Sequence, residues 1–96
     1  MATGGFTYIM TNRMHGVLYV GVTAEIERRI WQHRNGEGSI FCRKYGLDRL
    51  VHVEEHSSIE DAIRREKQLK KWRREWKIEL IESANPEWLD LGSRFG

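Results

Sequence analysis

The chain has 96 residues, of which 40% are hydrophobic and 31% charged, an ordinary composition for a soluble globular protein. This length allows one domain, residues 1–96, with a modest core. No apolar run is long enough to cross a membrane, and the first residues lack the pattern of a signal peptide. The one cysteine, Cys42, cannot form an intrachain disulfide. We therefore expect a cytoplasmic protein that has no membrane partner.

The net charge of +2 is small but unevenly distributed along the chain. Residues 64–77 carry eight basic side chains and two acidic ones, whereas residues 78–96 carry four acidic side chains and one basic one. A basic segment of this kind is compatible with a face that binds nucleic acid. It is also compatible with the solvated outer surface of a helix, and the sequence leaves both interpretations open.

The predicted elements follow one another without repeats or linkers. Residues 6–11 and 17–22 alternate as a β-hairpin does, and residues 24–36 predict a helix capped by Thr23 and closed by Gly36. Residues 37–46 read as a loop and residues 50–56 as a third strand. Residues 59–83, capped by Ser57 or Ser58, predict one helix or two helices joined near residues 72–74. The order β-β-α-β-α-(α) indicates an α/β fold in which helices cover a small sheet.

The predicted hairpin carries a tyrosine in each strand. If its loop has four residues, 12–15, then Tyr8 and Tyr19 are direct cross-strand neighbours on one face of the sheet. Such a pair is either a packing contact or part of a site. Gly21, two residues beyond Tyr19, indicates a bulge or a close approach of backbone or ligand.

Two polar residues lie beside the apolar stripe of the first predicted helix. Arg29 and His33 are four residues apart and share the side that Ile26 and Ile30 define. Arg29 could extend over the core edge while His33 is a hydrogen-bonded boundary residue. Alternatively, both could serve a functional site.

A carboxylate falls at the centre of the apolar arc of the later helix. Glu66 lies among Ile59, Ala62, Ile63 and Leu69 when residues 59–71 are placed on a helix. A buried carboxylate needs a cation, a metal or several hydrogen bonds. Glu66 therefore either pairs with an arginine such as Arg29 or binds a divalent metal.

Together these residues suit one reaction. Two tyrosines, an arginine, a histidine and a glutamate could converge on one sheet face beneath two helices. Phosphodiester hydrolysis needs a cation for the phosphate charge, a metal that activates water and a positioned base.

These motifs resemble those of the GIY-YIG endonuclease superfamily, over nearly the whole chain. The segment Tyr19–Gly21 (YVG) matches the second family motif, and Tyr8 retains the tyrosine of the first. Arg29 stands ten residues after Tyr19, where the family arginine falls, and His33 and Glu66 match the family histidine and glutamate. The small stand-alone bacterial members are the most similar, and they are usually described as endonucleases by inference only.

The resemblance implies an antiparallel three-stranded sheet packed with helices, an α+β arrangement, and one divalent metal, Mg²⁺ or Mn²⁺, bound by Glu66. It implies a metal-dependent endonuclease that hydrolyses phosphodiester bonds in nucleic acid, with DNA as the expected substrate. One tyrosine would take part in activating water, while the other and Arg29 contact the scissile phosphate. Asn85 is the candidate for an asparagine that some members place near the metal.

Further residues are expected to bind nucleic acid, and two rival functions remain open. The expected contacts are Gly21, Arg43, Lys44, Lys67 and Lys70. The same cations would serve a non-catalytic nucleic-acid-binding module of the same fold. A second rival is an interaction protein that uses Trp72, Trp76 and Trp88 as a partner-binding face. The enzyme would be weakly selective, would select a nucleic-acid structure, or would take its selectivity from a protein partner or a homo-oligomer.

Overall fold

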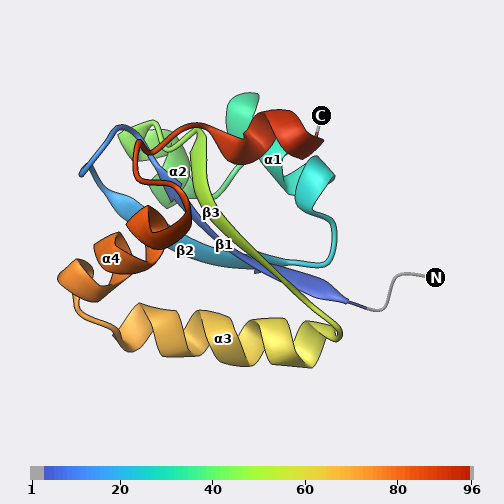
Figure 1. Ribbon diagram of the computed structural model, residues 1–96. Coiled ribbons are helices and arrows are strands. Elements are labelled where there is room, and N and C mark those ends of the chain that lie inside the picture. Colours follow the sequence, from blue (N-terminus) through green and yellow to red (C-terminus); the bar gives the residue numbers. More distant parts are fainter. Residues whose placement is uncertain (1–3, 96) are drawn as a thin grey trace.

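The computed structural model describes residues 4–95, and its centre is a three-stranded antiparallel sheet in the order β2-β1-β3 (Figure 1). The strands are β1 (Gly5–Thr11), β2 (Leu18–Thr23) and β3 (Arg49–His56). The helices are α1 (Ile26–Arg34), α2 (Ile40–Tyr45), α3 (Ile59–Lys71) and α4 (Arg74–Ala84), followed by a 3₁₀ helix, η1 (Leu91–Phe95). This α+β arrangement and the three strands confirm the predicted fold class.

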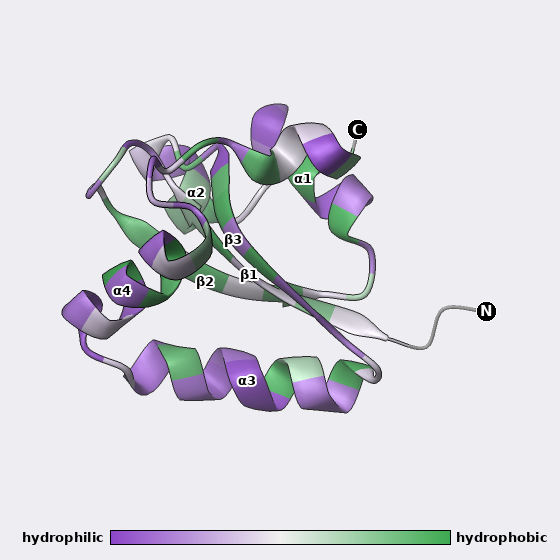
Figure 2. Cartoon of the chain, in the orientation of Figure 1, coloured by the Kyte–Doolittle hydropathy of each residue, from purple (hydrophilic) through white to green (hydrophobic). Residues whose placement is uncertain are grey.

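The sheet separates two hydrophobic clusters because successive residues of a strand point to opposite faces. On one face, Tyr8 and Met10 of β1 pack with Ile26 and Ile30 of α1. On the other face, Ile9 packs with residues of α3, α4 and the segment that follows, namely Leu69, Ile81 and Trp88. Figure 1 shows α3 and α4 on the side of the sheet away from α1. Figure 2 shows hydrophobic residues along the strands and hydrophilic residues over much of α3.

The register of the hairpin differs from the prediction. Tyr8 pairs with Gly21, and Tyr19 pairs with Met10, so the two tyrosines are diagonal neighbours. The loop has six residues because the side chain of Asn12 accepts a hydrogen bond from the Val17 amide at 3.0 Å, in place of a ladder bond. The tyrosine rings still lie on one face, with their centroids 6.4 Å apart.

Helix α2 occupies part of the segment that was expected to be a loop. The hydroxyl group of Ser39 accepts a hydrogen bond from the Cys42 amide, and Gly46 ends the helix with φ of +64°. These are ordinary helix caps. The prediction was wrong because the segment between the caps has only six residues, too few for a helical period to be evident.

The remaining helices agree closely with the predictions. Ser58 caps α3 through the Asp61 amide, and the chain forms two helices that are separated at Trp72 and Arg73. Gly36 follows α1 with φ of +72°. Thr23 does not cap α1, which begins at Ile26, because its hydroxyl group is bonded to the backbone of Glu25 instead.

Most of the basic segment lies on α3 and the start of α4, and several of its cations have structural partners. Arg65 binds Glu54 of β3, Lys70 binds Glu66, and Arg74 donates to the carbonyl oxygens of His15 and Gly16 in the hairpin loop. Only part of the positive charge of this segment therefore remains available for a ligand. Within residues 4–95, no helix has both the length and the apolar character needed to cross a membrane.

Candidate active site

The candidate site begins at Tyr8, a fully buried residue of the central strand. Its cross-strand partner, Gly21, leaves the room that the ring occupies. A Cβ atom added at Gly21 would lie 2.5 Å from the Cζ and hydroxyl oxygen of Tyr8 and 3.0 Å from Cε2 of Tyr19. The group that closely approaches the Gly21 backbone is therefore the ring of Tyr8. The bulge-like irregularity of the sheet lies elsewhere, between β1 and β3 at Ile9 and Met10.

His33 completes a buried polar group with Tyr8. Its Nε2 atom lies 3.3 Å from the Tyr8 hydroxyl oxygen, while its Nδ1 atom is buried without a hydrogen-bond partner. Burial and the positive charge of Arg29 lower the pKa of His33 below its ordinary value. The histidine is therefore neutral near pH 7, and its Nε2 atom can accept the phenolic proton of Tyr8.

Burial also raises the pKa of Tyr8, although the positive charge of the neighbouring Arg29 opposes the rise. Tyr8 is consequently a phenol, not a phenolate, at neutral pH. Tyr19 is only partly buried, and its ring centroid is 6.1 Å from that of His33. Tyr8, Tyr19, Arg29 and His33 thus come together on the α1 face of the sheet, at its β2 side.

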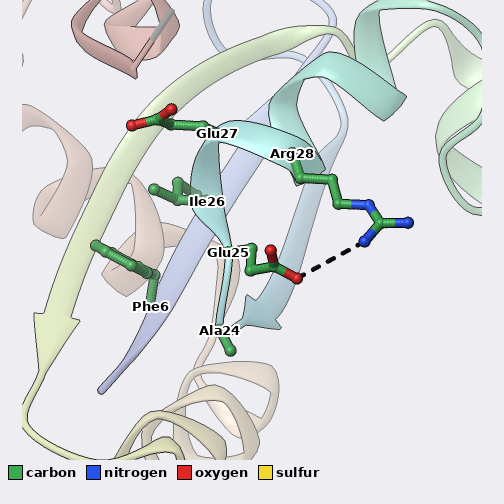
Figure 3. A pocket seen from close by; sticks show the side chains of 6 residues that line it. All are labelled: Phe6, Ala24, Glu25, Ile26, Glu27 and Arg28. Atoms are coloured by element: carbon green, nitrogen blue, oxygen red, sulfur yellow. Dashed lines mark ion pairs between the residues drawn. The ribbon is translucent and has the colours of Figure 1, made fainter. Parts of the chain in front are cut away.

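Arg29 also lines a polar pocket of about 170 Å³ where β2 ends and α1 begins. The other lining residues are Thr23, Glu25, Arg28 and Gln32. A neighbouring pocket shares Glu25 and Arg28, which form an ion pair at 3.8 Å (Figure 3). That pocket also contains Phe6, Ile26 and the carboxylate of Glu27, so it suits a phosphate less well. Sequence reasoning missed Arg28 and Gln32, although their spacing of four residues places them on one helix surface.

Glu66 does not lie on the same face of the sheet as these four residues, contrary to the prediction. It belongs to α3, which packs against the opposite face, where the Thr7 hydroxyl group donates to the Ala62 carbonyl oxygen at 2.8 Å. The carboxylate is 13% exposed and pairs with Lys70 at 2.7 Å, one helical turn away. No ion pair with Arg29 exists among the described residues.

The position of Glu66 around α3 nevertheless directs it toward the β2 edge. Ala62 and Leu69 form the buried line of the helix, and Arg65 lies on the flank that binds Glu54 of β3. Glu66 is about 100° further around the helix, on the other flank. Because α3 covers β1 and β2, this second flank is the one that lies toward β2.

The residues fit a metal that is held mainly by water and substrate. Residues 4–95 contain no cluster of three or more histidine, cysteine or acidic side chains able to hold a metal. Mg²⁺ is commonly bound through one or two carboxylates, with waters and phosphate oxygens as its other ligands. The hard carboxylate oxygens of Glu66 are suitable for that role. Binding of a metal there would break the ion pair between Glu66 and Lys70.

The other predicted residues divide into exposed cations and structural groups. Arg43, Lys44, Lys67 and Lys70 are exposed, and Lys70 is also paired with Glu66. Asn85 is instead a cap, because its amide group donates to the carbonyl oxygens of Val51 and Leu89 and accepts from the Leu89 amide. These bonds occupy the side chain that had been expected near the metal.

The three tryptophans that would form the partner-binding face of the rival interaction protein differ in exposure. Trp88 is fully buried, Trp72 packs against the same core cluster, and only Trp76 of the three is exposed, at 47%.

Comparison with known proteins identifies the family to which this fold belongs. Residues 4–79 match the model of the GIY-YIG catalytic domain, and the chain belongs to that family. It is 38% identical over 71 residues to a UPF0213 protein of Syntrophus aciditrophicus, covering 73% of this chain and 80% of that one. It is also 38% identical over 67 residues to a UPF0213 protein of Haloquadratum walsbyi, covering 70% and 75% of the two chains.

A solved structure supports the same assignment. The solution NMR structure of a UPF0213 protein from Bacillus halodurans matches with a TM-score of 0.51 and 33% identity, covering 82% of this chain and 83% of that one. The chain is thus a small GIY-YIG-type protein, and its family supports a nuclease class of function.

Proposed function

We propose that this protein is a metal-dependent endonuclease that hydrolyses phosphodiester bonds in nucleic acid, with DNA as the expected substrate. The observation that carries the proposal is the buried hydrogen bond between Tyr8 and the neutral His33, beside the Arg29 guanidinium. A buried, incompletely bonded polar group next to a cationic pocket is costly for the fold and suits a reaction centre.

Each residue has a role in this proposal. Arg29 binds the scissile phosphate and stabilises the charge that develops on it, and the Tyr19 hydroxyl group donates to a phosphate oxygen. The Tyr8 hydroxyl group receives a proton from the attacking water as its own proton passes to Nε2 of His33. Glu66 holds the divalent metal, which when bound supplies charge for the phosphate and lowers the pKa of water.

A nuclease assay tests the proposal. The wild-type protein would be incubated with single-stranded, duplex and branched DNA and with RNA, in Mg²⁺, in Mn²⁺ or in EDTA. We expect cleavage that requires metal and that Glu66→Ala abolishes. Glu60→Ala, which removes an exposed carboxylate from the same helix, is the matched control and should cleave normally.

The possible outcomes separate the proposal from its rival. Cleavage by Glu66→Ala at the wild-type rate would contradict the metal-binding role. If no substrate is cut while salt-sensitive binding persists, the protein is a binding module of the same fold.

A further inference from the structure

Helix α2 presents aromatic rings to solvent next to the candidate active site. Phe41 is 44% exposed and Tyr45 is 43% exposed, while Cys42 is the one buried residue of the helix. The two rings are also in contact with each other, and contiguous exposed apolar side chains mark interaction sites more often than isolated ones do.

The exposed rings are continuous with the site. The Phe41 ring stacks on Tyr19 with a centroid distance of 6.1 Å and an interplanar angle of 28°, and it contacts Tyr45 at 4.8 Å. Tyr19 in turn contacts both Tyr8 and His33. A row of aromatic rings therefore leads from the buried hydroxyl group of Tyr8 to the exposed ring of Phe41.

Positive charge lies on the same helix. Arg43 and Lys44 are both exposed, and the Lys44 Nζ atom lies 5.5 Å from the centroid of the Tyr45 ring. Helix α2 contains no acidic residue. Exposed aromatic rings beside cations are a surface on which proteins bind single-stranded nucleic acid, through stacked bases and paired phosphates.

We propose that Phe41, supported by Tyr19 and Tyr45, stacks on an unpaired base of a single-stranded nucleic acid and thereby positions the adjacent phosphate at the site. This inference rests on the proposed function and specifies its substrate class. Bases within a duplex stack on each other, so a free base face requires a single strand, a loop or a frayed end. Arg43 and Lys44 bind the phosphates that flank the stacked base.

The test measures binding in EDTA, so that it does not depend on cleavage. The full chain is titrated into a labelled DNA single strand, its duplex, an RNA strand of the same sequence, and a strand of equal length without bases. The variants are Phe41→Leu, which keeps apolar volume but removes the ring, and Phe41→Tyr, which restores a ring. Trp76→Leu removes a ring of similar exposure from α4, on the opposite face, and serves as the control.

We expect Phe41→Leu to weaken binding of a single strand about 5- to 150-fold, the effect of losing one stacked base. Binding of the duplex and of the strand without bases should not change, and Phe41→Tyr and Trp76→Leu should bind like the wild type. The preferred strand, DNA or RNA, identifies the source of the base. Circular dichroism confirms that each variant is folded.

Several results would overturn the inference. They are equal losses on single strand and duplex, no binding of any single strand, or a change of oligomeric state in Phe41→Leu that accounts for its effect. A different result would contradict the proposed function alone. In that case single-strand binding would depend on Phe41, but no strand would be cut. If strands are cut but Phe41→Leu binds them normally, the stacking inference alone fails.

Discussion

The hydroxyl group of Tyr8 is buried in the α1 face of the sheet, where a polar group loses the hydration it has in water. The hydrogen bond to His33 compensates for part of that loss, while the buried Nδ1 atom of His33 has no hydrogen-bond partner among the described residues. Tyr8 therefore packs in the hydrophobic core with its ring and contributes to the candidate site with its hydroxyl group. A change at Tyr8 would alter packing as well as chemistry, and His33 offers the cleaner test.

His33 predicts the pH dependence of cleavage. Because its pKa in the folded protein lies below the ordinary value of 6.5, the neutral form that accepts a proton persists to below pH 6.5. The acid limb of kcat/KM should therefore lie below pH 6.5, and His33→Ala should lower the rate about 10²–10⁴-fold and remove the limb. A pH–rate profile at saturating metal measures this. An acid limb centred above pH 6.5, or one unchanged in His33→Ala, would contradict the assignment.

Glu54 of β3 makes a different prediction, for stability. Burial opposes its ionisation, but hydrogen bonds from His52 and Arg65 and the charge of Arg65 outweigh it and lower the pKa of Glu54 to about 2. A carboxyl group whose pKa is lower in the folded state than its ordinary 4.5 stabilises the fold above pH 4.5. That stabilisation is lost as pH falls from 4.5 toward 2.

Glu54→Gln should accordingly reduce the free energy of unfolding by about 1–3 kcal/mol at pH 7 and flatten its pH dependence between 4.5 and 2. Urea unfolding across this pH range measures both effects. Asp61→Asn, which removes an exposed ion pair with Arg64, should cost less than about 1 kcal/mol. Equal losses in the two variants would show that the bonds of Glu54 contribute no more than a surface pair.

At the level of the elements, the β1–β2 hairpin depends on Gly21. An added Cβ atom there would collide with the Tyr8 ring, which is held in a packed core. Gly21→Ala should therefore destabilise the protein by about 1–3 kcal/mol and lower activity, because the ring has to move. In a Tyr8→Leu background the same substitution should cost much less, since the colliding atoms are gone. Thermal unfolding of the four proteins gives the coupling, and strictly additive effects would contradict it.

The same hairpin shows what the sequence could and could not predict. Alternation of apolar residues predicted both strands and placed Tyr8 and Tyr19 on one face. It did not predict their register, because the side chain of Asn12 replaces a backbone ladder bond and lengthens the loop. The Ser39 and Gly46 caps of α2 were present in the sequence, but short-range pattern alone does not distinguish six helical residues from a loop.

At the level of the whole molecule, the position of Glu66 depends on topology. Helical periodicity correctly predicted a carboxylate with little exposure. Which face of the sheet α3 covers is decided by the path of the chain after β3, and no local pattern contains that information. The four residues of the α1 face and the carboxylate on α3 are therefore on opposite sides of β2. In the proposed function, a phosphodiester has to lie across the edge of this strand to reach both.

The central position of β1 has a consequence for how the molecule opens. Strand β1 lies between β2 and β3, and its side chains belong to both hydrophobic clusters. Neither cluster can therefore come apart without disturbing β1. Its amide hydrogens should exchange with deuterium only through global unfolding, whereas those along the free edge of β2 should exchange through smaller local openings. The strand beside the proposed substrate path would then be the one able to adjust its backbone while the rest of the sheet stays closed.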